Sequence, residues 1–127
     1  MKRTSLLAAA FFGFTGVAMG AFAAHGLKET LLEKGYTQVF ETAVRFQFYH
    51  TFALLATGIL LHLNFDRLLN YAASCFIMGI LFFSGSLYAL CFTGLVIFGP
   101  ITPIGGTIMI IGWGLFFTGI LITKKVS

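Results

Sequence analysis

Three histidines, His25, His50 and His62, are the side chains in this chain best suited to bind a metal or move a proton. Imidazole nitrogens ligate haem iron and transition metals, so His25 and His50 form a candidate pair near one end of two apolar segments, joined for a metal by Glu29. No ligand motif of fixed spacing accompanies the pair. A structural interpretation competes, in which His25 caps a helix and His50 hydrogen-bonds to a neighbouring helix beside Gln47.

Two serines, Ser84 and Ser86, could supply a nucleophile only with a positioned base and an orienting acid. His50 could approach them, but the apolar segments that would face them offer no acid. In membrane helices serines commonly hydrogen-bond to a carbonyl or to another helix. We therefore expect no catalytic residue and predict that the protein is not an enzyme.

The composition indicates the class of protein in which these residues are positioned. The 127 residues are 58% hydrophobic and 9% charged, whereas soluble domains are about 45–50% apolar and about 25% charged. The net charge of +4 comes from Lys and Arg at the ends of apolar segments, not from a basic reading surface. A soluble enzyme and a nucleic-acid binder are excluded, which leaves a membrane protein.

Four apolar segments are long enough to cross a bilayer, for which a helix needs about 20 residues. They cover about 6–24, 46–63, 68–92 and 103–123. Since backbone polar groups in lipid must be satisfied within a segment, each should be a helix. We predict an all-α, four-transmembrane-helix bundle that forms one membrane domain over residues 1–127. The first segment resembles a secretory signal, but its long apolar run favours a retained helix.

The connection over residues 25–45 carries most of the loop charge. Residues 27–34 predict a short interfacial amphipathic helix that Gly35 ends, with Leu27, Leu31 and Leu32 directed toward lipid. Thr37 is the expected N-cap of a long helix that begins outside the hydrocarbon and continues through the second segment.

The distribution of Lys and Arg predicts the orientation. An even number of spans places both termini on the same side of the membrane. That side carries five cations and the other side three, and cytoplasmic loops are the ones enriched in Lys and Arg, so both termini should be cytoplasmic. The five are Lys2, Arg3, Arg67, Lys124 and Lys125, and the three are Lys28, Lys34 and Arg45. No charged side chain falls in the middle of a span, which disfavours proton-coupled transport.

Small residues recur along three of the spans, where they let helix backbones approach closely. The candidate packing glycines are Gly13, Gly16, Gly20, Gly79, Gly105, Gly106 and Gly112. Packing within the bundle is the favoured interpretation, with dimerisation or docking onto a larger membrane complex as the alternative. Thr102 is expected to cap the last helix, with Pro103 at its first position.

Four motifs, in order along nearly the whole chain, resemble a known family. They are Gly20-Ala-Phe-Ala-Ala-His25-Gly-Leu27, Thr42-Ala-Val-Arg-Phe-Gln-Phe-Tyr-His50, Phe83-Ser-Gly-Ser-Leu-Tyr88 and Ile101-Thr-Pro-Ile-Gly-Gly106. The chain resembles domain of unknown function 423, or uncharacterised protein family 0382, to which transmembrane protein 256 is related. Ala23, Phe46 and Phe48 depart from the common pattern. The resemblance implies a multi-pass plasma (inner) membrane protein with no established activity, substrate or cofactor.

These observations favour a non-enzymatic structural, assembly or lipid-contacting module. Its expected partners are membrane lipids, further copies of itself or a larger membrane complex, with no nucleic acid and no cofactor. A haem- or metal-binding protein using His25 and His50 is the alternative, and small-solute transport ranks third. The candidate polar site comprises His25, Gln47, Tyr49, His50, Ser84, Ser86, Tyr88 and Thr102.

Overall fold

The computed structural model describes residues 1–124, and every regular element among them is a helix. Their bounds are α1 Lys2–Ala24, α2 Lys28–Lys34, α3 Thr37–His62, α4 Leu68–Thr93, the 3-10 turn η1 Val96–Phe98, and α5 Ile101–Ile122. Four of the helices within residues 1–124 are long and apolar enough to cross a membrane. The predicted all-α fold, with four spans and a short helix after the first, is confirmed. Lys125, counted above in the charge distribution, lies outside the described residues.

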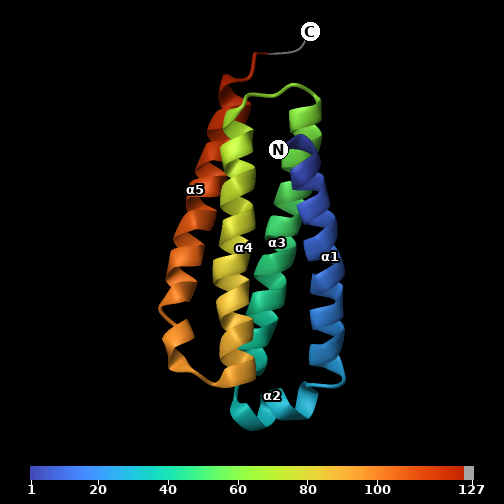
Figure 1. Ribbon diagram of the computed structural model, residues 1–127, viewed down its shortest axis with the longest axis vertical. Coiled ribbons are helices and arrows are strands. Elements are labelled where there is room, and N and C mark those ends of the chain that lie inside the picture. The colour runs from blue at the N-terminus through green and yellow to red at the C-terminus, as the bar shows by residue number, and fades with distance from the viewer. Residues whose placement is uncertain (125–127) are drawn as a thin grey trace.

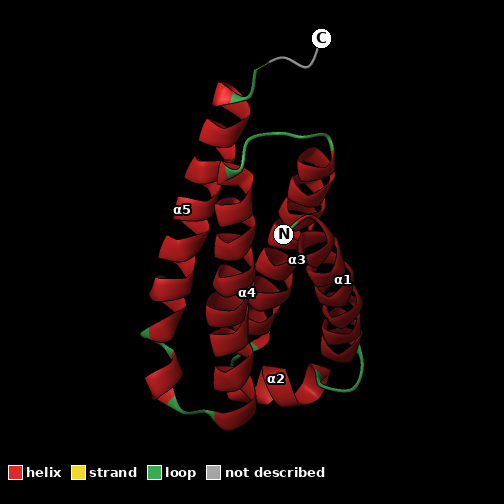
Figure 2. Cartoon of the chain, turned by 45° about the horizontal axis from the view of Figure 1, so that its top comes forward, coloured by secondary structure: helices red, strands yellow, loops and turns green. Residues whose placement is uncertain are grey.

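The four long helices form an open antiparallel row in the order α1, α3, α4, α5 (Figure 1). Each packs mainly on its neighbours in this row, so α1 and α5 are the two edges. The shared core contains Phe12 of α1, Leu54 of α3, Phe76 of α4 and Met109 of α5. Helix α2 crosses the end of the row that is remote from the N-terminus (Figure 2). The inner helices α3 and α4 are consequently the best placed to hold buried polar groups.

A constant register joins α1 to α3. A Cβ atom on Gly20 would lie 3.7 Å from Val44, and one on Gly13 would lie 3.7 Å from Thr51. The two residue numbers of each pair add to 64. A constant sum is expected for straight antiparallel helices, because the number on one helix rises by as much as the facing number on the other falls. The α4–α5 pairs have an equally constant register, adding to 188: Gly79 with Met109, Phe83 with Gly105, Phe76 with Gly112, and Leu69 with Gly119.

The predicted packing glycines divide into tight and loose positions. A methyl group on Gly105 would collide with the backbone of Phe83, so the backbones of α4 and α5 approach closely at this point. Added Cβ atoms would also be crowded, at 2.5–3.0 Å from the nearest atom, at Gly16, Gly79 and Gly112. Gly13, Gly20 and Gly106 leave ordinary contacts of 3.6–3.7 Å. Gly58 of α3, absent from the prediction, is also tight, because a Cβ atom added to it would lie 2.7 Å from the Leu6 side chain.

Helix α2 packs on the bundle differently from the prediction. Leu31 is buried against Phe40 of α3 and Cys91 of α4, so the expectation that it faces lipid is wrong. The cause is local: Gly35 ends α2 in the left-handed conformation (φ 74°), and the Tyr36 N–H donates to the Leu31 carbonyl at 2.9 Å. This reversal turns Leu31 inward.

Two predicted helix caps are also wrong. Helix α3 already includes Thr37, since the Phe40 N–H donates to the Tyr36 carbonyl at 2.9 Å, and the Thr37 hydroxyl is buried without a hydrogen-bond partner. Helix α5 begins at Ile101, so Thr102 lies inside its first turn. A first-turn amide has no partner within its own helix, which is why Pro103 is tolerated there.

Candidate functional site

Gln47 joins three helices at the centre of the predicted polar site. From α3, its Nε2 donates to the Phe12 carbonyl of α1 at 2.8 Å and to Thr15 Oγ1 at 2.9 Å. Its Oε1 accepts a hydrogen bond of 2.6 Å from the Tyr88 hydroxyl of α4. Both amide protons are therefore used within the protein, and the side chain is only 3% exposed. A side chain so fully engaged holds helices together and has no free donor for a substrate.

The two serines make further links between helices. Ser84 Oγ donates to the Ala43 carbonyl of α3 at 2.7 Å. Ser86 Oγ donates to the Phe83 carbonyl at 2.8 Å and lies 2.6 Å from Thr102 Oγ1 of α5. Because one hydroxyl has a single proton, Thr102 is the donor to Ser86. Both serines are buried and hydrogen-bonded as structural residues.

His50 is bound through both ring nitrogens. Its Nε2 lies 3.0 Å from Trp113 Nε1 of α5, and its Nδ1 lies 2.7 Å from the Phe46 carbonyl. An indole N–H only donates, so Nε2 accepts and Nδ1 carries the proton that it donates to Phe46. This neutral tautomer leaves no lone pair for a metal unless Trp113 moves away.

The structure separates His25 from the other polar candidates. His25 lies exposed where α1 ends. In the α1–α3 register it is level with residue 39, eleven residues before His50, which corresponds to about 16 Å along the helix axis. One iron or metal ion cannot bridge such a pair, so the haem or metal hypothesis is not supported. Among residues 1–124, no three His, Cys, Asp or Glu side chains gather as a metal site.

Tyr49 does not join the buried set. It is 51% exposed on the outer face of α3, with its ring centroid 5.7 Å from that of Phe46. The structure therefore brings together Gln47, Ser84 and Tyr88 in one cluster and Ser86 with Thr102 in another. His50 pairs with Trp113, whereas His25 and Tyr49 stay on the surface.

Two residues of this arrangement were missed from the sequence, Trp113 and Thr15. The signal at Trp113 was present, because a tryptophan inside an apolar span carries an N–H that needs a partner. Thr15 gave no such signal, since a threonine in a membrane helix can bond to its own backbone, as its 3.0 Å contact with the Phe11 carbonyl shows.

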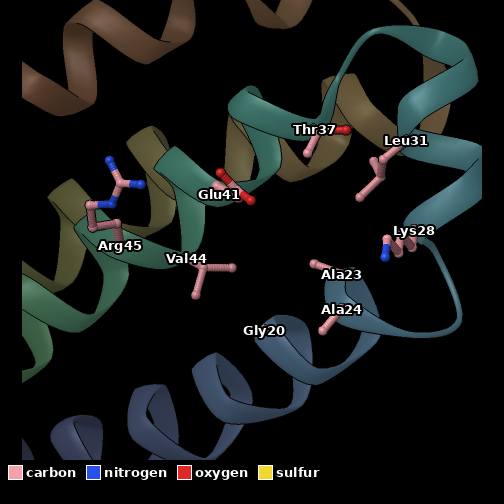
Figure 3. A pocket seen from close by; sticks show the side chains of 9 residues that line it. All are labelled: Gly20, Ala23, Ala24, Lys28, Leu31, Thr37, Glu41, Val44 and Arg45. Carbon is pink, nitrogen blue, oxygen red and sulfur yellow. The ribbon is translucent and has the colours of Figure 1, made fainter.

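Cavities of the part of the chain that the structure describes open between the helices, and three of them concern the site. Two are almost wholly apolar: one of about 300 Å³ lies between α1 and α4 over Gln47, and one of about 440 Å³ lies between α3 and α5 beside His50. The third, of about 370 Å³, lies where α1, α2 and α3 meet, and it is lined by charged as well as apolar side chains (Figure 3).

The fold and its polar residues together define a four-span helical membrane protein in which buried hydrogen bonds tie neighbouring helices. The family described as "Protein of unknown function (DUF423)" matches residues 19–106 of the chain. The chain belongs to this family, which confirms the resemblance found in its motifs.

Similar proteins cover most of the chain. The "UPF0382 membrane protein" of Haemophilus influenzae is 44% identical over 113 residues, which are 89% of this chain and 90% of that protein. The "UPF0382 membrane protein SSP2132" of Staphylococcus saprophyticus is 45% identical, over 81% and 84% of the two chains. The "UPF0382 inner membrane protein YgdD" of Escherichia coli K12 is 34% identical, over 98% and 94%. No solved structure matches the chain.

Proposed function

We propose that this protein is a non-enzymatic, lipid-contacting module of the plasma membrane. One observation carries the proposal: the buried side chains of the candidate site are already engaged in hydrogen bonds that join helices. Gln47 uses both amide protons, His50 uses both ring nitrogens, and Ser84 and Ser86 donate to carbonyls. A nucleophile or general base needs a free reactive atom facing a substrate, and these residues offer none.

The shape of the molecule supports lipid as the ligand. An open row of helices leaves grooves on its faces, and the α1–α4 and α3–α5 grooves are lined by side chains such as Leu81, Ile80 and Ile110. Acyl chains are the apolar molecules available at that depth in a bilayer, and grooves of about 300 and 440 Å³ can each hold a segment of one. The module would thus order lipid in the grooves on its two faces.

The proposed orientation has both termini in the cytoplasm. The bias of Lys and Arg toward the side of the termini supports it. The name of the Escherichia coli relative, an inner membrane protein, supports the plasma membrane as the location. In this orientation α2 lies on the outer side.

A native mass spectrum of the full chain, extracted gently from its own membrane, tests the proposal. We expect the protein mass plus retained phospholipid, without haem or metal, from cells supplied with iron and haem precursor. The same spectrum reports the number of subunits, and a further copy or a stoichiometric partner would identify an assembly role for the edge helices α1 and α5. One haem or metal per chain, lost on His50→Ala, or a complete lack of retained lipid, would refute the proposal.

A further inference from the structure

The cavity at the α2 end differs from the two apolar grooves in its charge. It is enclosed by the last turns of α1, by α2 and by the first turns of α3, and its volume is about 370 Å³ (Figure 3). Small-molecule sites begin near 300 Å³, so the space suits a compact ligand. Its lining comprises Gly20, Ala23, Ala24, Lys28, Leu31, Thr37, Glu41, Val44 and Arg45.

Opposite charges face this cavity from two elements. Figure 3 shows the Lys28 ammonium of α2 and the Glu41 carboxylate of α3 turned toward the same space from opposite sides. Arg45, four residues after Glu41 on α3, also lines the cavity, and Figure 3 shows its guanidinium apart from the Glu41 carboxylate. A ligand that fits this arrangement carries a negative group for Lys28 and a positive group for Glu41.

Apart from Thr37 and Arg45, the rest of the lining is apolar. Gly20, Ala23 and Ala24 of α1 create the space because they have small side chains or none, and Val44 closes it toward the bundle. The hydrocarbon is predicted to begin near residue 46 of α3, so Glu41 stands about 8 Å outside it. That is the depth of phospholipid headgroups, since they occupy the outer several ångströms of each leaflet.

We propose that this cavity binds the headgroup of a phospholipid that carries both a phosphate and a primary amine, with the phosphate at Lys28 and the ammonium at Glu41. A primary ammonium donates hydrogen bonds to a carboxylate, and a protonated lysine donates to a phosphate oxygen. A quaternary amine cannot donate, and a glycerol headgroup has no positive charge. The inference rests on the proposed function, because only a protein that holds lipid can select a headgroup.

The test uses the full chain in mixed micelles that contain equal amounts of phosphatidylethanolamine, phosphatidylglycerol and phosphatidylcholine with identical acyl chains. Native mass spectrometry counts each lipid retained. We expect phosphatidylethanolamine to be enriched about fivefold over the other two, as one interfacial ion pair allows. Glu41→Gln should abolish this enrichment, and Lys28→Gln should reduce retention of all three lipids.

Matched controls lie on α2. Glu33→Gln and Lys34→Gln remove the same charges from exposed positions outside the cavity lining, and both should retain the wild-type preference. Gly20→Leu should fill the cavity and remove the preference without removing a charge. Circular dichroism of each variant establishes that it is folded before its lipids are compared.

The outcomes separate this inference from the function on which it rests. If the wild type retains lipid with equal amounts of the three headgroups, or prefers phosphatidylglycerol, the headgroup assignment is wrong and the proposed function stands. If it retains no lipid, both are wrong. If water-soluble phosphoethanolamine displaces the bound lipid when present at the same concentration, the ligand is a soluble ester and the lipid assignment is overturned.

Discussion

The Tyr88 hydroxyl of α4 donates a 2.6 Å hydrogen bond to Gln47 Oε1 of α3, across 41 residues of sequence. The opposite end of the same amide holds the Phe12 carbonyl and the Thr15 hydroxyl of α1. One side chain therefore fixes the relative positions of three helices in the row. In lipid, where helices gain little from hydrophobic burial against one another, such bonds and close backbone packing determine the architecture.

Gly105 and Gly106 form a matched pair that tests backbone packing between α4 and α5. A methyl group at Gly105 collides with the Phe83 backbone, which cannot move aside as a flexible side chain can, while Gly106 has room at 3.6 Å. We expect Gly105→Ala to lower the free energy of unfolding by about 1–3 kcal/mol. Gly106→Ala should change it by less than about 0.5 kcal/mol. Equal effects in a detergent unfolding titration would contradict the close approach.

Gly16 begins a GxxxG motif in α1, Gly16-Val-Ala-Met-Gly20, and tests whether this motif serves the bundle or an oligomer. Its added Cβ would lie 3.0 Å from Phe48 of α3, so Gly16→Leu should destabilise the fold by about 1–3 kcal/mol and leave the subunit number unchanged. Gly114→Leu is the control, because Gly114 has open space around it on α5. A loss of subunits in Gly16→Leu at unchanged stability would place the motif in an interface between copies.

Trp113 is the single tryptophan of the chain, so its fluorescence reports directly on its contact with His50. His50→Leu removes the acceptor of the indole N–H, and we expect a shift in the emission maximum and a loss of stability of about 1–3 kcal/mol. Zinc or ferrous ions should leave the wild-type spectrum unchanged, since both His50 nitrogens are engaged. Metal-dependent quenching that His50→Leu abolishes would instead indicate a metal site.

The orientation predicts which engineered thiols react from outside. Glu33→Cys on α2 should react with a membrane-impermeant maleimide in spheroplasts, because that end of the bundle is the proposed outer side. Arg67→Cys, exposed in the connection between α3 and α4, should react only after the membrane is disrupted. The wild type is the background control, since Cys91 is buried and Cys75 is partly buried. The reverse pattern would invert the proposed topology.

The sequence alone predicted the helices well, because the bilayer imposes their length and hydrophobicity locally. The sequence alone did not predict which side chains of different helices contact one another. The contacts of Gln47 depend on the α1–α3 register, and the His50–Trp113 bond joins residues 63 apart through the placement of α3 beside α5. A pattern of small residues found Gly105 but missed Gly58, whose partner is the large side chain of Leu6.

The burial of Leu31 shows a second feature that the sequence alone did not predict. Amphipathic spacing showed that α2 has an apolar face but not which surface covers it. That depends on Gly35, whose left-handed conformation turns α2 beneath the bundle. His25 and His50 were paired because both lie near one end of a span, and only the register shows that about 16 Å separates them along the axis.

A double-mutant cycle between Gln47 and Tyr88 tests the central claim, that the buried polar residues join helices rather than act on a ligand. The variants are Gln47→Leu, Tyr88→Phe and their combination, with Tyr49→Phe as an exposed control, and the free energy of unfolding is measured for each. We expect a coupling energy of about 0.6 kcal/mol and at most about 1.7 kcal/mol between the two residues, the mean and the maximum found for hydrogen bonds between membrane helices. A coupling energy of zero, with both single variants as stable as the wild type, would contradict the account.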